Sequence, residues 1–142
     1  VGRREQGQRL ADDFARTVAA LRSRYHRDRP LEVFYQIWHQ PLYTIGAGQL
    51  LGDALAVCGA RNLFADLPQP APQVSIEAVL ARDPQVILGG SDAELDGWQS
   101  WPQLRAVQLD QVWPVPDSGL ERPSFRMLGA LQRLCESLAR AR

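Results

Sequence analysis

The sequence predicts an α/β fold, a three-layer α/β/α sandwich with a mostly parallel central sheet. Three short runs rich in apolar, β-branched and aromatic residues are typical of buried strands: 31–38, 86–88 and 112–115. Helical patterns separate these runs. Strands joined through helices pair in parallel by right-handed crossovers, and a chain of 142 residues is long enough for one domain with its own core.

The first predicted element is an amphipathic helix over residues 5–27. Its apolar side chains recur every three or four residues, and Arg and Asp side chains lie between them: Leu10, Phe14, Val18, Leu21 and Tyr25. Asp28-Arg29-Pro30 ends the helix, and the strand at 31–38 follows.

A predicted loop over residues 39–44 follows this strand. Gly46-Ala47-Gly48 is expected to open a second helix, in which Cys58 faces inward and after which Gly59 is a natural terminating residue. Residues 62–64 are expected to form a short strand. The proline-rich stretch 67–72 must be an extended loop, because proline donates no backbone hydrogen bond.

The second half of the chain continues the alternation. Ser75 is a good N-cap for a helix over 76–81, with Glu77 in its first turn, and Asp83-Pro84 stops that helix. A short helical stretch is expected over 101–106. A closing amphipathic helix is expected from Pro123 onward.

Composition excludes several classes of partner. Sixteen basic residues balance sixteen acidic ones, so no global positive field would recruit nucleic acid. No run approaches the roughly 18 apolar residues of a membrane span, and the N-terminal residues lack the apolar core of a signal peptide. The signal of an exported protein would lie upstream of this sequence. Cys58 and Cys135 lack C-x-x-C spacing, which leaves one structural disulfide or two buried thiols.

The sequence gives little support for catalysis, a metal site or a nucleotide site. The two histidines, His26 and His39, occur without a G-x-S-x-G motif that would supply a nucleophile. Gly46 and Gly48 resemble part of a phosphate-binding loop, but Leu51 stands where the third glycine belongs. We therefore expect a binding protein with no cofactor of its own rather than an enzyme.

The loop after the first strand is the best candidate for a binding site. Ligands of parallel α/β folds bind outside the carboxyl ends of the strands, and this loop carries Trp38, His39 and Tyr43. These side chains suit a flat, partly apolar ligand. Alternatively, Trp38 and Tyr43 pack under the following helix, and periodicity does not separate the two interpretations.

Three separated segments carry a family resemblance: Pro41-Leu42-Tyr43-Thr44-Ile45-Gly46, the stretch from Ala56 to Phe64, and the stretch from Pro72 to Leu80. In this order and spacing they resemble the periplasmic cobalamin-binding proteins of ABC importers and their relatives that bind haem and iron-siderophores. Such proteins have two α/β lobes joined by a rigid helix and hold ligand between the lobes. The resemblance implies that 31–142 form the C-terminal ligand-binding lobe, that 1–30 end the connecting helix, and that the N-terminal lobe is missing here.

The resemblance also implies roles for individual residues. Cys58 and Cys135 would be joined by a disulfide, which fits an oxidising periplasm. Tyr43 would face the corrin ring beside Trp38 and His39. Ser118 and Arg122 would belong to a second cleft loop, in which the guanidinium suits propionamide or carboxylate groups.

Glu77 matches a glutamate that docks on arginines of the membrane permease, although a glutamate in a first helical turn is also common for dipole reasons alone. Two positions depart from the pattern, because Ala71 and Gly119 replace aromatic residues of the cleft. Haem or an iron-siderophore is therefore the alternative ligand. An α/β enzyme with His39 or Glu77 as general base, and an interaction module without a small ligand, are the alternatives of other classes.

Overall fold

The computed structural model describes residues 2–39, 41–48, 50–115 and 127–141. Its centre is a four-stranded sheet in the order β4-β1-β5-β6, and all of its strand pairs are parallel. The strands are β1 (Leu31–Tyr35), β4 (Ala60–Asn62), β5 (Val86–Gly89) and β6 (Val112–Pro114). The predicted parallel sheet is confirmed.

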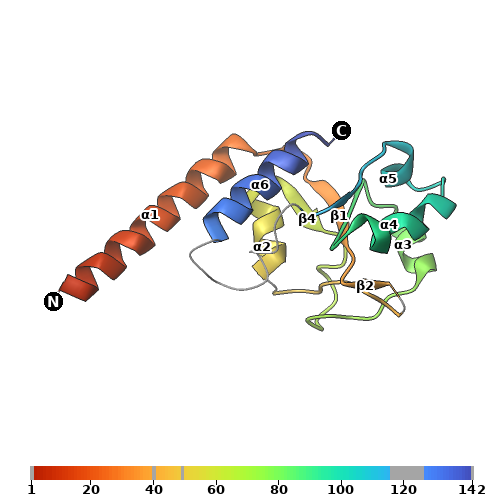
Figure 1. Ribbon diagram of the computed structural model, residues 1–142, viewed down its shortest axis with the longest axis horizontal. Coiled ribbons are helices and arrows are strands. Elements are labelled where there is room, and N and C mark those ends of the chain that lie inside the picture. Colours follow the sequence, from red (N-terminus) through yellow and green to blue (C-terminus); the bar gives the residue numbers. More distant parts are fainter. Residues whose placement is uncertain (1, 40, 49, 116–126, 142) are drawn as a thin grey trace.

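Helices cover both faces of this sheet (Figure 1). One face carries α1 (Gly2–Arg24), α2 (Leu50–Val57) and α6 (Met127–Ala139). The other face carries α3 (Ile76–Arg82), α4 (Asp92–Leu95), the 3₁₀ helix η1 (Asp96–Ser100) and α5 (Arg105–Gln108). The strand side chains alternate accordingly, because Val33 is buried with the first group of helices and Phe34 with the second. The three-layer sandwich is therefore also confirmed.

Helix α1 corresponds to the predicted N-terminal helix, displaced by about one turn toward the N-terminus. Near its C-terminal end Leu21 is buried and Val18 is partly buried, and these residues pack in the same cluster as α2 and α6. The N-terminal end of α1 extends well away from the rest of the molecule (Figure 1). None of the helices in the described ranges is long and apolar enough to cross a membrane.

Helix α3 begins where the sequence predicts and ends at Arg82, one residue later than expected. The Ser75 hydroxyl accepts a hydrogen bond from the Ala78 N–H at 3.1 Å, which satisfies a donor of the first turn. Asp83 ends the helix in a left-handed conformation with φ 50°, and its N–H donates to the Val79 carbonyl.

The expected start of the second helix at Gly46 is wrong, since α2 begins at Leu50. Gly46 instead lies in an extended segment against residues 67–70, where its N–H donates to the Pro70 carbonyl at 3.1 Å. A Cβ at this glycine would lie 1.8 Å from the Gln69 carbonyl oxygen. The glycine therefore serves a close approach of two backbones rather than a helix start.

Two other boundaries also differ from expectation. The short strand expected at 62–64 is β4, at Ala60–Asn62, and Leu63 and Phe64 follow it in a turn. The Asn62 side chain stabilises this turn by accepting the Phe64 N–H at 3.2 Å and donating to the Ile45 carbonyl at 2.7 Å. The helical stretch expected at 101–106 is α5, which begins only at Arg105 because Leu104 before it is extended.

The disulfide implied by the family resemblance is confirmed. The Sγ atoms of Cys58 and Cys135 lie 2.06 Å apart. Both residues are buried, at 2% and 0% exposure. The bridge joins the chain just after α2 to α6, so it holds two helices of the same layer together.

Candidate functional site

A short antiparallel hairpin follows the carboxyl end of β1. It consists of β2 (Trp38–His39) and β3 (Leu42–Tyr43), at the lower edge of the view in Figure 1. The expectation of an irregular loop over 39–44 is therefore wrong. The Ile37 N–H donates to the Tyr43 carbonyl at 2.9 Å and continues the pairing toward β1.

The hairpin register places Trp38 directly opposite Tyr43. Side chains of directly opposed residues lie on the same face of a strand pair, so the two aromatic groups are neighbours. The Trp38 side chain is 49% exposed and also interacts with a neighbouring group. The Tyr43 side chain is half-buried. Leu42 is buried in the second core cluster and anchors the hairpin. The hairpin thus presents an aromatic surface at the carboxyl edge of the sheet.

The segment before α3 extends the hairpin on its other side. Gln73 forms an isolated antiparallel bridge with Tyr43, and the Val74 N–H donates to the Leu42 carbonyl at 2.9 Å. Helix α3 begins two residues after Val74, and Glu77 in its first turn is exposed. The aromatic hairpin and the Glu77 helix are therefore joined by backbone hydrogen bonds.

Gln36 anchors the start of the hairpin, and sequence reasoning missed it. Its side chain is buried, at 2% exposure, between β1 and the α4–η1 segment. The side-chain oxygen accepts the Trp98 indole N–H at 2.6 Å, and the side-chain nitrogen donates to the Glu94 carbonyl at 2.9 Å. The Gln36 backbone N–H donates to the Leu88 carbonyl at 2.8 Å. A polar residue at the end of an apolar run was the available signal for such an anchor.

The other predicted site residues are only partly described. The backbone of His39 pairs with Leu42 in the hairpin, and its side chain lies outside the described part of the structure. Ser118 and Arg122 lie outside the described residues altogether, as does Gly119. Within the described ranges, no group of three or more His, Cys, Asp or Glu side chains could hold a metal ion.

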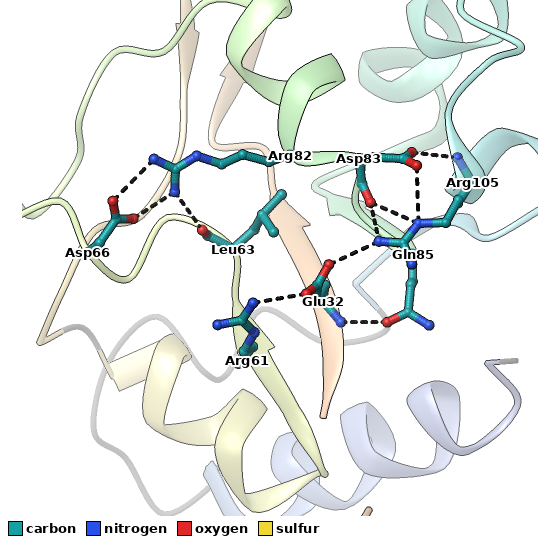
Figure 2. Close-up of polar contacts among 8 residues, drawn as sticks. All are labelled: Glu32, Arg61, Leu63, Asp66, Arg82, Asp83, Gln85 and Arg105. Atoms are coloured by element: carbon teal, nitrogen blue, oxygen red, sulfur yellow. Dashed lines mark hydrogen bonds and ion pairs between the residues drawn. The ribbon is translucent and has the colours of Figure 1, made fainter. Parts of the chain in front are cut away.

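A second polar cluster joins β1, β4 and the turn after it to the ends of α3 and α5 (Figure 2). The Glu32 carboxylate accepts hydrogen bonds from Arg61 and Arg105, each at 2.9 Å. Arg105 also pairs with the Asp83 carboxylate, at 3.2 Å, and so ties α5 to the end of α3. The hydrogen bond from Arg61 is the main reason why the pKa of Glu32 is lowered, with Arg105 contributing and burial opposing the shift.

Arg82 completes this cluster. Its guanidinium pairs with both oxygens of Asp66, at 2.7 and 3.1 Å, and donates to the Leu63 carbonyl (Figure 2). It also lies over the Phe64 ring, 4.4 Å from the centroid. The Arg82 hydrogen bond lowers the pKa of Asp66. The charges lining the hollow of about 360 Å³ at this cluster thus pair with one another, and we interpret the cluster as structural.

The lowered pKa of Glu32 predicts a loss of stability in acid. A carboxylate whose pKa is lower in the folded state stabilises the fold above its unfolded pKa, about 4.5, and loses that contribution as pH falls through the folded value. We expect the free energy of unfolding, measured by urea denaturation, to fall less between pH 7 and pH 3 for Glu32→Gln than for the wild type. Glu136→Gln, at an exposed position of α6, is the control and should keep the wild-type difference. An identical pH dependence in all three proteins would contradict this assignment.

Comparisons with known proteins agree with the architecture. The sequence profile of the periplasmic binding protein family matches residues 1–113. The chain is 40% identical over 137 residues to a vitamin B12-binding protein of Vibrio cholerae serotype O1, covering 94% of this chain and 50% of that protein. A vitamin B12-binding protein of Yersinia pestis is 37% identical over 140 residues, covering 95% and 48% respectively.

Solved structures of periplasmic binding proteins also superpose on this chain. The crystal structure of the periplasmic vitamin B12-binding protein of Vibrio cholerae superposes with a TM-score of 0.81 at 40% identity, covering 95% of this chain and 54% of that one. A periplasmic haem-binding protein of the same organism superposes with a TM-score of 0.80 at 17% identity, covering 95% and 57%, which shows a shared fold. The chain spans about half the length of the curated relatives that it matches.

Proposed function

This chain belongs to the periplasmic binding protein family, and on that premise we propose that it forms one wall of a cleft that binds cobalamin or a related corrinoid in the periplasm. The protein would deliver this ligand to the permease of an ABC importer. The observation that carries the proposal is the pair of aromatic residues, Trp38 and Tyr43, side by side on the hairpin at the carboxyl edge of the sheet.

The chemistry of the hairpin supports a corrinoid. A corrin ring is broad and flat, and aromatic side chains bury large apolar area against such a surface at little cost in conformational entropy. The carboxyl edge of a parallel sheet is where ligands of this fold class bind. The relatives that are 37–40% identical are vitamin B12-binding proteins. His39, Ser118 and Arg122 are proposed as further ligand contacts by the resemblance stated above.

The domain assignment is part of the same proposal. Residues 31–142 form the C-terminal lobe, and residues 1–30 end the helix that connects it to an N-terminal lobe. The coverage of about half of each relative supports this division, as does the extension of α1 away from the lobe (Figure 1). A ligand held between two lobes buries most of its surface only when both are present, so this lobe alone should bind weakly.

Glu77 is proposed as the residue that docks on the permease. Its carboxylate is exposed in the first turn of α3, where an arginine of a partner can reach it. Charge-assisted pairs between carboxylate and guanidinium groups fix the register of two proteins. The backbone hydrogen bonds from Val74 to the Leu42 carbonyl and from Thr44 to the Pro72 carbonyl support a docking helix placed close to the ligand.

Haem is the second candidate ligand. The superposition on a haem-binding protein supports it at the level of the fold alone, because that protein is only 17% identical. The replacement of a cleft aromatic by Ala71, which is exposed, weakens the case for cobalamin itself and leaves other tetrapyrroles in consideration. Binding, rather than catalysis, is the function that the family membership supports in both cases.

Isothermal titration of cyanocobalamin into the full two-lobe protein tests the proposal. We expect tight binding by the wild type and about tenfold weaker binding by Trp38→Ala and by Tyr43→Ala, because each change removes an aromatic contact face. Trp38→Phe keeps an aromatic ring at the same position and is expected to bind close to the wild type.

The same titration with hemin separates the two ligands. Heat from hemin with none from cyanocobalamin would overturn the corrinoid assignment and keep the aromatic hairpin. Corrinoid binding that neither alanine variant weakens would instead move the site away from the hairpin.

A further inference from the structure

An apolar hollow of about 210 Å³ opens between the hairpin, the start of α3 and the α4–η1 segment. The residues that line it come from three separate parts of the sequence: Gln36, Leu42, Ile76, Ala93, Glu94, Gly97, Trp98 and Trp101. Small-molecule sites usually measure about 300–1,000 Å³, so this hollow is sized for a single protein side chain.

Most residues that line the hollow are apolar, with Gln36 and Glu94 as the polar ones, and its mouth is open to solvent. Leu42 and Trp98 are buried beneath it, at 8% and 4% exposure. Ile76 is 38% exposed and Trp101 is partly exposed. Ile76 and Trp101 therefore offer apolar surface at the mouth of the hollow that a partner side chain could contact.

One carboxylate, Glu94, lines the hollow. Glu77, Asp92 and Asp96 each adjoin a lining residue in the chain, so the segments that form the hollow are acidic. Among the residues that the structure describes, none of these four carboxylates forms an ion pair.

The two arginines of the helices on this face, α3, α4, η1 and α5, are already paired. Arg82, on α3, binds Asp66, and Arg105, on α5, binds Glu32 and Asp83. A mostly apolar hollow that is lined by one unpaired carboxylate and formed by acidic segments is complementary to a basic segment that carries one large apolar side chain.

We propose that the permease inserts an apolar side chain of a basic, periplasm-facing segment into this hollow when its arginine reaches Glu77. The inference rests on the docking role proposed for Glu77 and adds the apolar anchor beside it. The anchor contacts Leu42 in the hairpin. The next residue, Tyr43, is the one proposed to face the ligand. Buried anchors of this kind carry most of the binding energy of an interface, whereas rim charges chiefly set orientation and association rate.

The test uses a substitution whose new side chain fills the hollow. A Cβ at Gly97 would meet no atom within 4 Å, so Gly97→Leu should fold and occupy the space that the anchor needs. Gln99→Leu is the matched control, because it adds the same apolar side chain to the same exposed element outside the hollow. Ile76→Ser is a second variant, which removes an exposed part of the apolar wall. Binding of the full two-lobe proteins to the permease in lipid nanodiscs is measured by surface plasmon resonance.

We expect Gly97→Leu and Ile76→Ser to weaken permease binding about tenfold, mainly through faster dissociation, and Gln99→Leu to bind as the wild type does. Glu77→Gln should slow association instead. All variants should bind cyanocobalamin as the wild type does, which also shows that they are folded.

If Glu77→Gln weakens permease binding while Gly97→Leu and Ile76→Ser bind as the wild type does, the apolar anchor is overturned and the docking role of Glu77 is kept. Equal weakening by Gly97→Leu and Gln99→Leu would also overturn it, since the effect would not depend on the hollow. A wild type that binds cyanocobalamin but not the permease would overturn both the anchor and the proposed docking.

Discussion

Replacing Cys58 and Cys135 together with alanine is expected to lower the free energy of unfolding by about 4 kcal/mol. The bridge closes a loop of 77 residues, so it removes much conformational freedom from the unfolded chain. That loop includes three of the four strands of the central sheet, and the reduced protein would have to order them without the constraint. Urea denaturation of the two proteins, compared at equal pH, measures the difference.

The single variants are the control for this prediction. Cys58→Ala and Cys135→Ala each break the same bridge, so each is expected to cost nearly as much as the double replacement. Two single effects that add up to the double effect would show that packing of the sulfur atoms, rather than the cross-link, carries the stabilisation. Equal urea midpoints for the double variant and the wild type would contradict the prediction outright.

Gln36→Leu is expected to destabilise the protein by about 2–4 kcal/mol, because it leaves two buried polar groups without their partners. The Trp98 indole N–H would lose its acceptor, and the Glu94 carbonyl would lose its donor. Leucine has a similar volume, so the change tests the hydrogen bonds rather than the packing. The measurement is urea denaturation followed by Trp fluorescence, since Trp98 reports directly on this contact.

Gln36→Glu is the matched variant. An ionised glutamate keeps an acceptor for the indole but cannot donate to the Glu94 carbonyl, and burial of its charge adds a desolvation cost, so we expect it to destabilise the protein more than Gln36→Leu does. Because Gln36 precedes the hairpin, both variants should also weaken corrinoid binding by the full protein. Unchanged stability of Gln36→Leu would mean that water entering from the adjacent hollow replaces the lost partners.

Local signals predicted several elements correctly. The three- and four-residue spacing from Val18 to Tyr25 predicts the part of α1 that packs on the lobe. Ser75 and the Asp83-Pro84 pair bound α3 because capping depends only on residues next to the helix ends. The apolar run at Val86 identifies β5, which is buried on both faces. The pairing of the two cysteines followed from the family resemblance and not from their spacing.

The missed features depend on contacts between distant segments. Two-residue strands such as β2 and β3 are too short for an alternating pattern, so the hairpin could not be recognised in the sequence. Gly46 looked like the start of a helix, but its role is set by the approach of residues 67–70.

The sequence by itself determined the layered α/β fold, because the alternation of strand and helix patterns and the helix caps depend on residues that are close together in the sequence. The tertiary structure decided which side chains form the sites. It placed Trp38 beside Tyr43 through hairpin pairing, and it assembled the mostly apolar hollow from segments that include Leu42, Ile76 and Trp101. Leu42, Ile76 and Trp101 lie far apart along the chain, and only the packing of α3 and η1 against the sheet brings them together. No local pattern in the sequence carries that information.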